Sequence, residues 1–187
     1  MRRTGKNSEK DGRSTIRVAG REWPILDRIT IGRRMYLVLE KLGHADRQRY
    51  LVFDPHAGPG GDLRGLLMAP ATRAAKQHLR ILKRLSTGNT NLPLVLDYHS
   101  VNDQLMVVTT WVRGPDLETY LDQVRAGGKP RPSANEAFRL FRGLAHGLSQ
   151  LHRRHGIVHG DIKPANLILA SGPVRLVMID YGSAWQC

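Results

Sequence analysis

The segment formed by residues 157–182 constrains this chain more than any other part of its 187 residues. It holds two short apolar runs, residues 167–170 and 174–179, which a Ser-Gly-Pro sequence at 171–173 connects. Short apolar runs joined by turn-forming residues are typical of paired antiparallel strands. We therefore predict a β-hairpin whose turn lies at Pro173.

Polar residues stand at both ends of this predicted hairpin. Asn166 lies seven residues before Pro173, and Asp180 lies seven residues after it. An antiparallel pairing about that turn places Asn166 and Asp180 side by side at the open end. Two oxygen ligands at one point are what Mg²⁺ takes from a protein when it also binds phosphates. We predict that Asn166 and Asp180 are metal ligands.

Two further charged residues precede the hairpin, on the loop that leads into it. Asp161 stands five residues before Asn166, and its carboxylate can accept a proton from an incoming hydroxyl. Lys163 follows two residues later, and its ammonium group can balance charge on a transferring phosphoryl group. The residue types in this segment therefore favour phosphoryl transfer.

The same segment resembles the catalytic loop and magnesium loop of protein kinases. In that family the pattern is H-R-D-x-x-x-x-N followed by D-F-G. This chain reads HGDIKPAN over residues 159–166 and DYG over residues 180–182. The resemblance extends over roughly residues 30–187. It implies ATP and Mg²⁺ as cofactors, and protein serine or threonine side chains as substrates.

The resemblance also assigns a role to each matching residue. Asp161 matches the catalytic base, and Lys163 matches the lysine that is typical of loops of the Ser/Thr type. Asn166 and Asp180 match the metal ligands, and the resemblance also assigns both of them to nucleotide binding. His159 matches a histidine that supports the magnesium loop. Two more nucleotide-binding positions are implied upstream, Gly43 and Thr110.

The implied fold class is α+β. It consists of an antiparallel five-stranded N-lobe with one helix over residues 30–113, followed by the first, mainly helical, part of the C-lobe over 114–187. Residues 1–20 are polar, basic and without periodicity, so we predict a disordered tail. The expected strands are residues 35–41, 49–53, 64–68, 92–96 and 104–110; the expected helices are 71–85, 115–126 and 134–155.

The predicted nucleotide-binding lobe departs from the family pattern. The expected glycine-rich loop keeps only Gly43. Met68 takes the place of the lysine that holds the phosphates, and residues 71–85 contain no acidic partner for it. Arg47 or Arg49 is an alternative cation for the phosphates. We therefore expect weak activity or none, and a degenerate nucleotide-binding lobe.

Two other functions stay open on these residues. One is a non-catalytic, pseudokinase-type binding module. The other is a small-molecule phosphotransferase, because the triplet His159-Gly160-Asp161 also resembles the aminoglycoside and choline kinase families. Gly160 stands where the family has an arginine that binds a phosphorylated activation loop. We therefore expect no control by phosphorylation of such a loop. We also expect a truncated domain, since the chain ends seven residues after Asp180.

Composition limits the partners and the compartment. The formal net charge is +13, which suits anionic partners. Arginines account for 22 of the 29 basic residues and are scattered along the chain. We therefore attribute the arginine excess to the composition of the genome rather than to nucleic-acid binding, which needs a clustered basic face. The single Cys187 and the lack of a long apolar run indicate a cytoplasmic chain without a membrane span. The substrate or binding partner is unknown, and a partner or a further C-terminal region is expected to be needed for stability.

Overall fold

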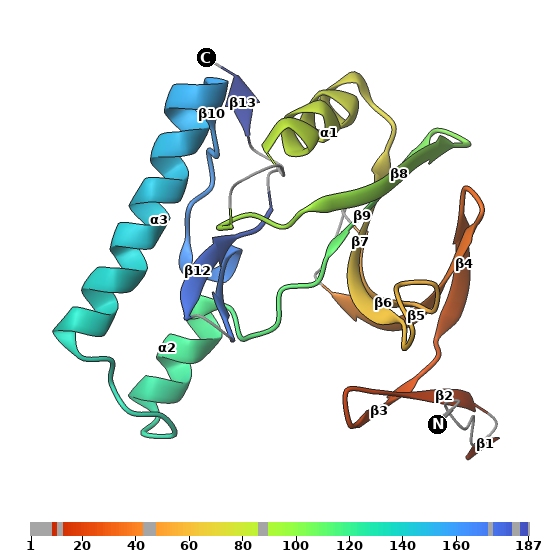
Figure 1. Ribbon diagram of the computed structural model, residues 1–187, viewed down its shortest axis with the longest axis horizontal. Helices are drawn as coiled ribbons and strands as arrows, with labels where there is room; N and C mark the ends of the chain where they lie inside the picture. Colours follow the sequence, from red (N-terminus) through yellow and green to blue (C-terminus); the bar gives the residue numbers. More distant parts are fainter. Residues whose placement is uncertain are drawn as a thin grey trace. The chain divides into compact units, whose positions relative to one another are not determined.

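The computed structural model describes residues 9–10, 13–42, 48–85, 90–171, 174–180 and 184–186. The chain divides into two compact units (Figure 1). The first unit comprises residues 1–71 and 96–111, and the second comprises residues 72–95 and 112–187. Described strands dominate the first unit, whereas the described helices belong to the second.

A six-stranded sheet forms most of the described part of the first unit. Its spatial order is β4 (Asp27–Ile31), β5 (Arg34–Leu42), β6 (Gln48–Asp54), β7 (Asp62–Pro70), β9 (Gln104–Thr110) and β8 (Val95–Val101). The strands from β4 to β9 pair in antiparallel fashion. The predicted α+β class with an antiparallel sheet is confirmed.

The sheet differs from the prediction at both of its edges. Strand β4 was not predicted, and its last residue, Ile31, is buried. Gly32, with φ of +60°, lies in the turn that leads into β5. At the other edge, β8 begins three residues later than predicted. Pro93 cannot donate a ladder hydrogen bond, and Leu92 is buried in the core of the second unit instead.

Successive residues of the strands contribute to two separate apolar clusters, because side chains alternate between the faces of a sheet. Leu37 and Val38 on β5 divide in this way, as do Val52 and Phe53 on β6. The Tyr36 cluster consists of the buried residues Ile31, Tyr36, Val38, Val52, Leu66 and Val108. The Trp23 cluster consists of Trp23, Leu37, Leu39, Leu51, Phe53 and Leu63.

The N-terminal segment is ordered where it is described, so the expected disorder over residues 1–20 is wrong there. Strands β1 (Glu9–Lys10), β2 (Arg13–Val18) and β3 (Arg21–Pro24) form a small separate sheet. Ala19 and Gly20, with φ of +50° and +82°, form the two-residue turn between β2 and β3. The arginine and glycine content of this segment is typical of disorder, but one buried aromatic residue, Trp23, anchors a short hairpin there. Residues 1–8 and 11–12 lie outside the described residues.

The second unit contains three described α-helices and short strands. These are α1 (Arg73–Leu85), α2 (Leu117–Arg125), α3 (Ala134–His155), β10 (Ile157–Val158), β11 (Leu167–Ala170), β12 (Arg175–Met178) and β13 (Trp185–Gln186), with a 3₁₀ turn η1 (Pro164–Asn166). A capping box formed by Ser133 and Glu136 starts α3, and Gly156 ends it in the left-handed conformation. No described helix is long and apolar enough to cross a membrane.

The core of the second unit is built around α3 and the hairpin of β11 and β12. Its buried members are Ile81, Leu92, Leu144, Leu151, Ile157, Leu167, Leu176, Met178 and Ala184. Ile81 belongs to α1, so this helix falls in the second unit, whereas the predicted boundary placed it in the lobe of residues 30–113.

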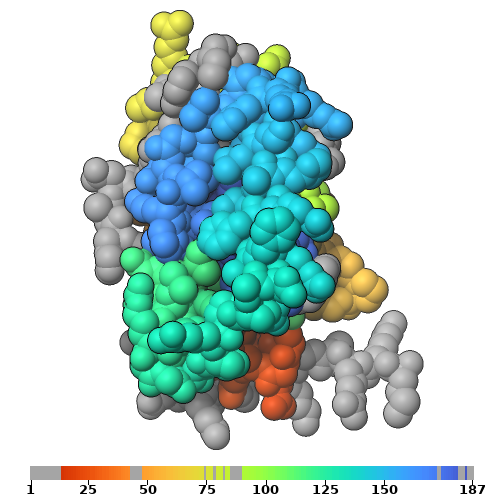
Figure 2. Space-filling model, turned by 90° about the vertical axis from the view of Figure 1, so that its left-hand side faces the viewer, coloured from red at the N-terminus to blue at the C-terminus, as the bar shows by residue number. Residues whose placement is uncertain are grey.

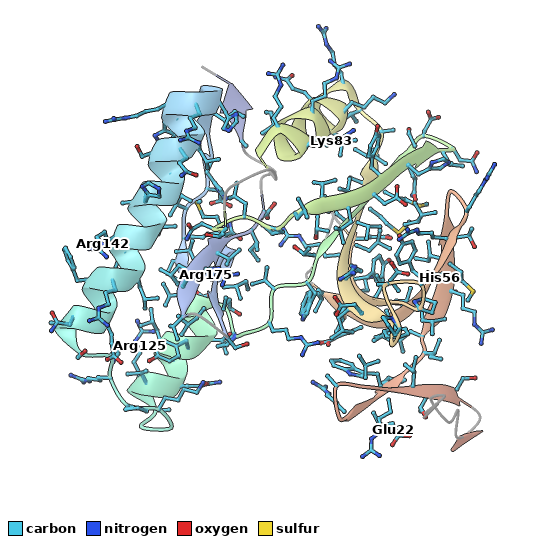
Figure 3. The ribbon with its side chains drawn as sticks, in the orientation of Figure 1. Glu22, His56, Lys83, Arg125, Arg142 and Arg175 are labelled. Carbon is cyan, nitrogen blue, oxygen red and sulfur yellow. The ribbon has the colours of Figure 1, made fainter. Side chains whose placement is uncertain are left out.

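The outer face of α3 is apolar at its N-terminal end. Phe138 is 66% exposed and Phe141 is 56% exposed, while Leu144 and Leu151 turn into the core. Figure 2 views the side on which α2 and α3 form the surface, and Figure 3 shows Arg142 on α3 pointing away from the β11–β12 hairpin. The helix therefore buries Leu144 and Leu151 but leaves Phe138 and Phe141 mostly exposed.

Candidate functional site

The loop of residues 159–163 is held at both ends by core elements. Before it, Ile157 on β10 is 1% exposed and packs in the core of the second unit. After it, η1 leads directly into β11, and Asn166 at the end of η1 is 5% exposed. Short, anchored connections of this kind place polar side chains with little freedom.

His159 is the most deeply buried polar residue of this loop, at 1% exposure. Its Nε2 atom lies 3.1 Å from the carbonyl oxygen of Ile179, and its Nδ1 atom accepts a hydrogen bond from the backbone N–H of Asp161. An accepting Nδ1 leaves the proton on Nε2, so the imidazole is neutral and donates to Ile179. His159 thus ties the loop to the end of β12. Burial lowers its pKa, and the nearby carboxylates of Asp180 and Asp161 oppose that shift.

Asp161, Lys163 and Asn166 form one hydrogen-bonded group. The Asp161 carboxylate accepts from the Asn166 Nδ2 atom at 2.8 Å, and the same carboxylate oxygen lies 2.9 Å from the Lys163 Nζ atom. The Asn166 Nδ2 atom also donates to the Asp161 carbonyl oxygen at 3.0 Å. Because both amide hydrogens point to oxygen acceptors, Asn166 has only its Oδ1 atom left for a cation.

The charge state of Asp161 follows from this group. The hydrogen bond from Lys163 is the largest influence that lowers the pKa of Asp161, and the Asn166 amide adds to it. The carboxylate is therefore ionised at neutral pH, as a proton acceptor must be. Its side chain is one-third exposed, so an incoming hydroxyl can reach it.

The hairpin register differs by one residue from the symmetric pairing predicted about Pro173. Leu167 pairs with Met178, and the Ile179 N–H donates to the Asn166 carbonyl oxygen at 2.9 Å. Asn166 is therefore opposite Ile179, and Asp180 is the next residue along. The connection between Ala170 and Arg175 spans four residues, so its midpoint falls before Pro173.

Asp180 leaves the strand through an unusual backbone conformation. Its φ is +62°, which is rarely adopted by a residue with a side chain. The other described non-glycine residues with positive φ are Ala19, Asn102 and Asp103, and all three occupy tight hairpin turns. Outside such a turn, a strained conformation of this kind is common at functional sites. Because Asp180 is not extended, strand alternation does not fix the direction of its side chain. Tyr181 and Gly182 lie outside the described residues.

The residues expected to bind the nucleotide belong to the first unit. Thr110 ends β9, where it pairs with Arg64 of β7. Gly43 and Arg47 lie outside the described residues. Arg49 is on β6 and pairs with Leu42 and Leu67. The structure thus places Thr110 and Arg49 on the six-stranded sheet of the first unit.

Met68 has an apolar setting on β7. It pairs with Gln48 and Met106 and packs, half-buried, against the Tyr36 cluster. The one cation on β7 is Arg64, whose guanidinium pairs with Asp62 and whose side chain is 15% exposed. Neither residue supplies the exposed ammonium group that the family pattern has on this strand.

Two supporting residues were missed by the sequence analysis. Asn91 is buried, donates from Nδ2 to the Leu176 carbonyl oxygen at 2.8 Å, and accepts from the Met178 N–H through its own carbonyl. It holds β12 in place, and no local pattern marks a loop asparagine for that role. Gly114 has φ of +140°, and an added Cβ would lie 2.0 Å from the Leu169 carbonyl oxygen of β11. In the sequence, Gly114 precedes a proline and therefore indicates only a turn, not a close approach to β11.

Comparison with known proteins agrees with this geometry. The family model for the protein kinase domain matches residues 69–187, which includes the whole loop and hairpin. A calcium/calmodulin-dependent protein kinase, cmkB, of Emericella nidulans is 28% identical over 155 residues, covering 82% of this chain and 35% of that protein. The MAP kinase kinase skh1/pek1 of Schizosaccharomyces pombe is 35% identical over 129 residues, covering 64% and 33%. The KEOPS complex subunit Bud32 of Pyrococcus abyssi is 30% identical over 105 residues, covering 56% and 42%.

The matched family model spans well over half of this chain, and the chain belongs to the protein kinase family. Protein kinases of the Ser/Thr class are among its relatives. The alignments cover between 33% and 42% of the length of the three relatives named above. Family membership rests on residues 69–187, which begin after most of the strands where the nucleotide-anchoring residues were expected.

Proposed function

We propose that this chain binds ATP with Mg²⁺ through Asn166 and Asp180 and has at most weak phosphoryl-transfer activity toward serine or threonine side chains of proteins. The observation that carries the proposal is the hydrogen-bonded group of Asp161, Lys163 and Asn166. Its members lie on a loop that a buried histidine ties to the end of β12.

The donor set near the hairpin suits Mg²⁺. The Asn166 Oδ1 atom and the Asp180 carboxylate are hard oxygen donors, and both residues flank the Ile179 backbone that closes the hairpin. Bound Mg²⁺ would supply charge neutralisation to the phosphates. Asp161 would accept the proton of the attacking hydroxyl, and Lys163 would balance the charge of the transferred group.

A second candidate is a non-catalytic kinase-like binding module, and one observation favours it specifically. Met68 packs against apolar residues of the sheet, and α1 carries no acidic residue. Losing one preorganised electrostatic donor typically costs about 10²–10³ in rate. In this second candidate, a chain with the loop intact and the anchoring pair absent would bind nucleotide weakly without measurable phosphoryl transfer.

A phosphotransfer assay separates these candidates. Purified chain is incubated with Mg²⁺, γ-labelled ATP and a library of serine- and threonine-containing peptides, and the Asp161→Asn variant serves as the matched control. Label transfer that disappears in Asp161→Asn supports the weak kinase. Equal label with both proteins indicates a contaminant and removes the catalytic role of Asp161. No transfer, with ATP still bound, supports the binding module.

A further inference from the structure

The helix α1 presents a basic face to solvent. Its lysine and arginine side chains are all exposed, and at 3.6 residues per turn their positions fall within an arc of about 100° around the helix. Leu79 and Ile81 are buried, and Ile81 belongs to the core of the second unit. We call the exposed side the α1 basic face; it consists of Arg73, Lys76, Arg80, Lys83 and Arg84.

The positive charge of this face has no acidic residue near it in the sequence. Residues 71–96 contain neither aspartate nor glutamate. Arg73, Lys76 and Arg80 form no ion pair with any other described residue. Arg153 and Arg154 add to the charge, because they are exposed in the last turn of α3, which ends at the same end of the second unit as α1 (Figure 1). Cations that are scattered along the sequence therefore gather at one end of this unit.

This arrangement is unfavourable for the helix by itself. Lys76 follows Arg73 by three positions, Arg80 follows Lys76 by four, and Lys83 and Arg84 follow Arg80 by three and four. Like charges at these spacings are neighbours on the helix surface and destabilise it. The helix dipole favours the cations of the last turn but opposes Arg73 in the first turn. An anionic partner would relieve both effects.

We infer that the α1 basic face binds the phosphate backbone of a nucleic acid. At 1.5 Å per residue, Arg73 and Arg84 are about 16 Å apart along the helix axis. The phosphates of one strand of a duplex are about 3.4 Å apart along its axis, so the row of cations matches about five of them in length. This surface goes beyond the proposed function and does not depend on it, because none of its residues belongs to the group around Asp161.

The composition of the face favours a nucleic acid over a membrane or an acidic protein. A helix that lies on a membrane inserts its apolar side, whereas Leu79 and Ile81 of α1 are already buried in the protein. A protein interface is usually centred on aromatic or apolar anchors. Among the described side chains of α1, the exposed ones are Gln77 and the cations of the basic face. Binding to a phosphate backbone needs cations alone.

The test measures binding of the full chain to a labelled DNA duplex of about 20 base pairs by fluorescence anisotropy, at several salt concentrations. The combined variant Arg73→Gln, Lys76→Gln and Arg80→Gln should bind at least about tenfold more weakly at about 100 mM salt. Its slope of log affinity against log salt should be smaller by about 2.7, because each lost phosphate contact removes about 0.9 from the slope.

The matched control removes the same charge elsewhere in the second unit. It combines Arg125→Gln, Arg139→Gln and Arg142→Gln, whose side chains are exposed on α2 and on the N-terminal half of α3. Figure 3 shows Arg125 and Arg142 away from Lys83 of α1. This control should change the affinity by less than about threefold.

A single variant guards against loss of the fold. Lys76→Glu places a carboxylate four residues before Arg80, which is a favourable pair on a helix, so α1 should persist while the duplex is bound more weakly. Thermal melting of all variants checks their folding, and Lys76→Glu decides the comparison if the combined variant does not melt cooperatively.

Three outcomes would overturn the inference. Equal loss in the combined variant and its matched control would show that the net charge of the chain, and not the α1 basic face, attracts the duplex. Binding to phosphatidylserine vesicles or to polyglutamate without binding to the duplex would assign the face to a different partner. A wild-type chain that does not bind the duplex at any salt concentration would remove the site.

Discussion

In the second unit, the residues expected to perform chemistry meet within one short stretch of chain. In the first unit, Met68 stands where the kinase resemblance expects the lysine that holds the phosphates. Asp161, Lys163 and Asn166 contact one another directly, whereas Met68 packs among apolar side chains. A compact hydrogen-bonded loop keeps its geometry through local contacts. A binding surface spread over several strands can lose single members while the sheet persists.

The contrast between the two units implies that the core of the second unit holds the loop of residues 159–163 in its geometry. Leu151 on α3 is fully buried in that core, so Leu151→Ala should lower the free energy of unfolding by about 2–5 kcal/mol. Phe138→Ala on the same helix is the matched control, because Phe138 is 66% exposed; it should change stability by less than about 0.5 kcal/mol. Urea titration of both variants measures the difference. Equal losses would show that α3 is not packed as described.

The approach of the chain to β11 should be nearly as sensitive. Gly114→Ala forces a Cβ against the Leu169 carbonyl oxygen and strains the backbone at φ of +140°, which should cost at least about 1–3 kcal/mol. Gly127→Ala is the matched control, since Gly127 also has positive φ but no neighbour within 4 Å, and it should cost about 1–2 kcal/mol. Thermal melting compares the two. A Gly114→Ala chain as stable as Gly127→Ala would mean that β11 does not depend on this contact.

His159 gives the loop a pH dependence of known sign. Burial lowers its pKa in the folded chain, so the unfolded chain binds the proton more readily. The stability that the neutral imidazole contributes is complete above about pH 6.5 and is lost as the pH falls below that value. His159→Gln removes the titrating group and should flatten this part of the curve of unfolding free energy against pH. An identical curve for both proteins would contradict a neutral buried His159.

The smallest effect on stability is expected at the exposed end of α3. Replacing Phe138 and Phe141 together by serine should leave the melting temperature nearly unchanged, because both side chains are mostly exposed. It should reduce self-association of the chain, since exposed aromatic residues favour contacts between molecules. Size-exclusion chromatography over a range of concentrations tests this. Unchanged elution, with the wild type monomeric throughout, would show that this face is inert.

Features encoded by local spacing could be predicted from the sequence. The capping box at Ser133 fixes the start of α3, and turn residues between apolar runs fix the hairpin of β11 and β12. The group around Asp161 follows from residues that are five positions apart or fewer. Each of these depends on neighbours in the chain, so one sequence is enough to find them.

Features that depend on distant contacts could not be predicted. One local feature was also misjudged: the register of the β11–β12 hairpin is off by one residue, because the length of its connection rather than Pro173 sets the midpoint. Trp23 orders a segment whose composition is typical of disorder, through contacts with residues of β5, β6 and β7. Asn91 supports β12 from 85 positions away in the sequence. No local pattern reveals such pairings.

The most direct test of the central claim, that the loop and hairpin of the second unit retain a metal site, is the Mg²⁺ dependence of ATP affinity. Calorimetric titrations of the wild type and Asp180→Ala are made with Mg²⁺ and with EDTA, and Asp161→Asn serves as a control that keeps both ligands. We predict that Mg²⁺ tightens ATP binding to the wild type and to Asp161→Asn but not to Asp180→Ala. Equal Mg²⁺-dependent binding by the wild type and Asp180→Ala would contradict the account.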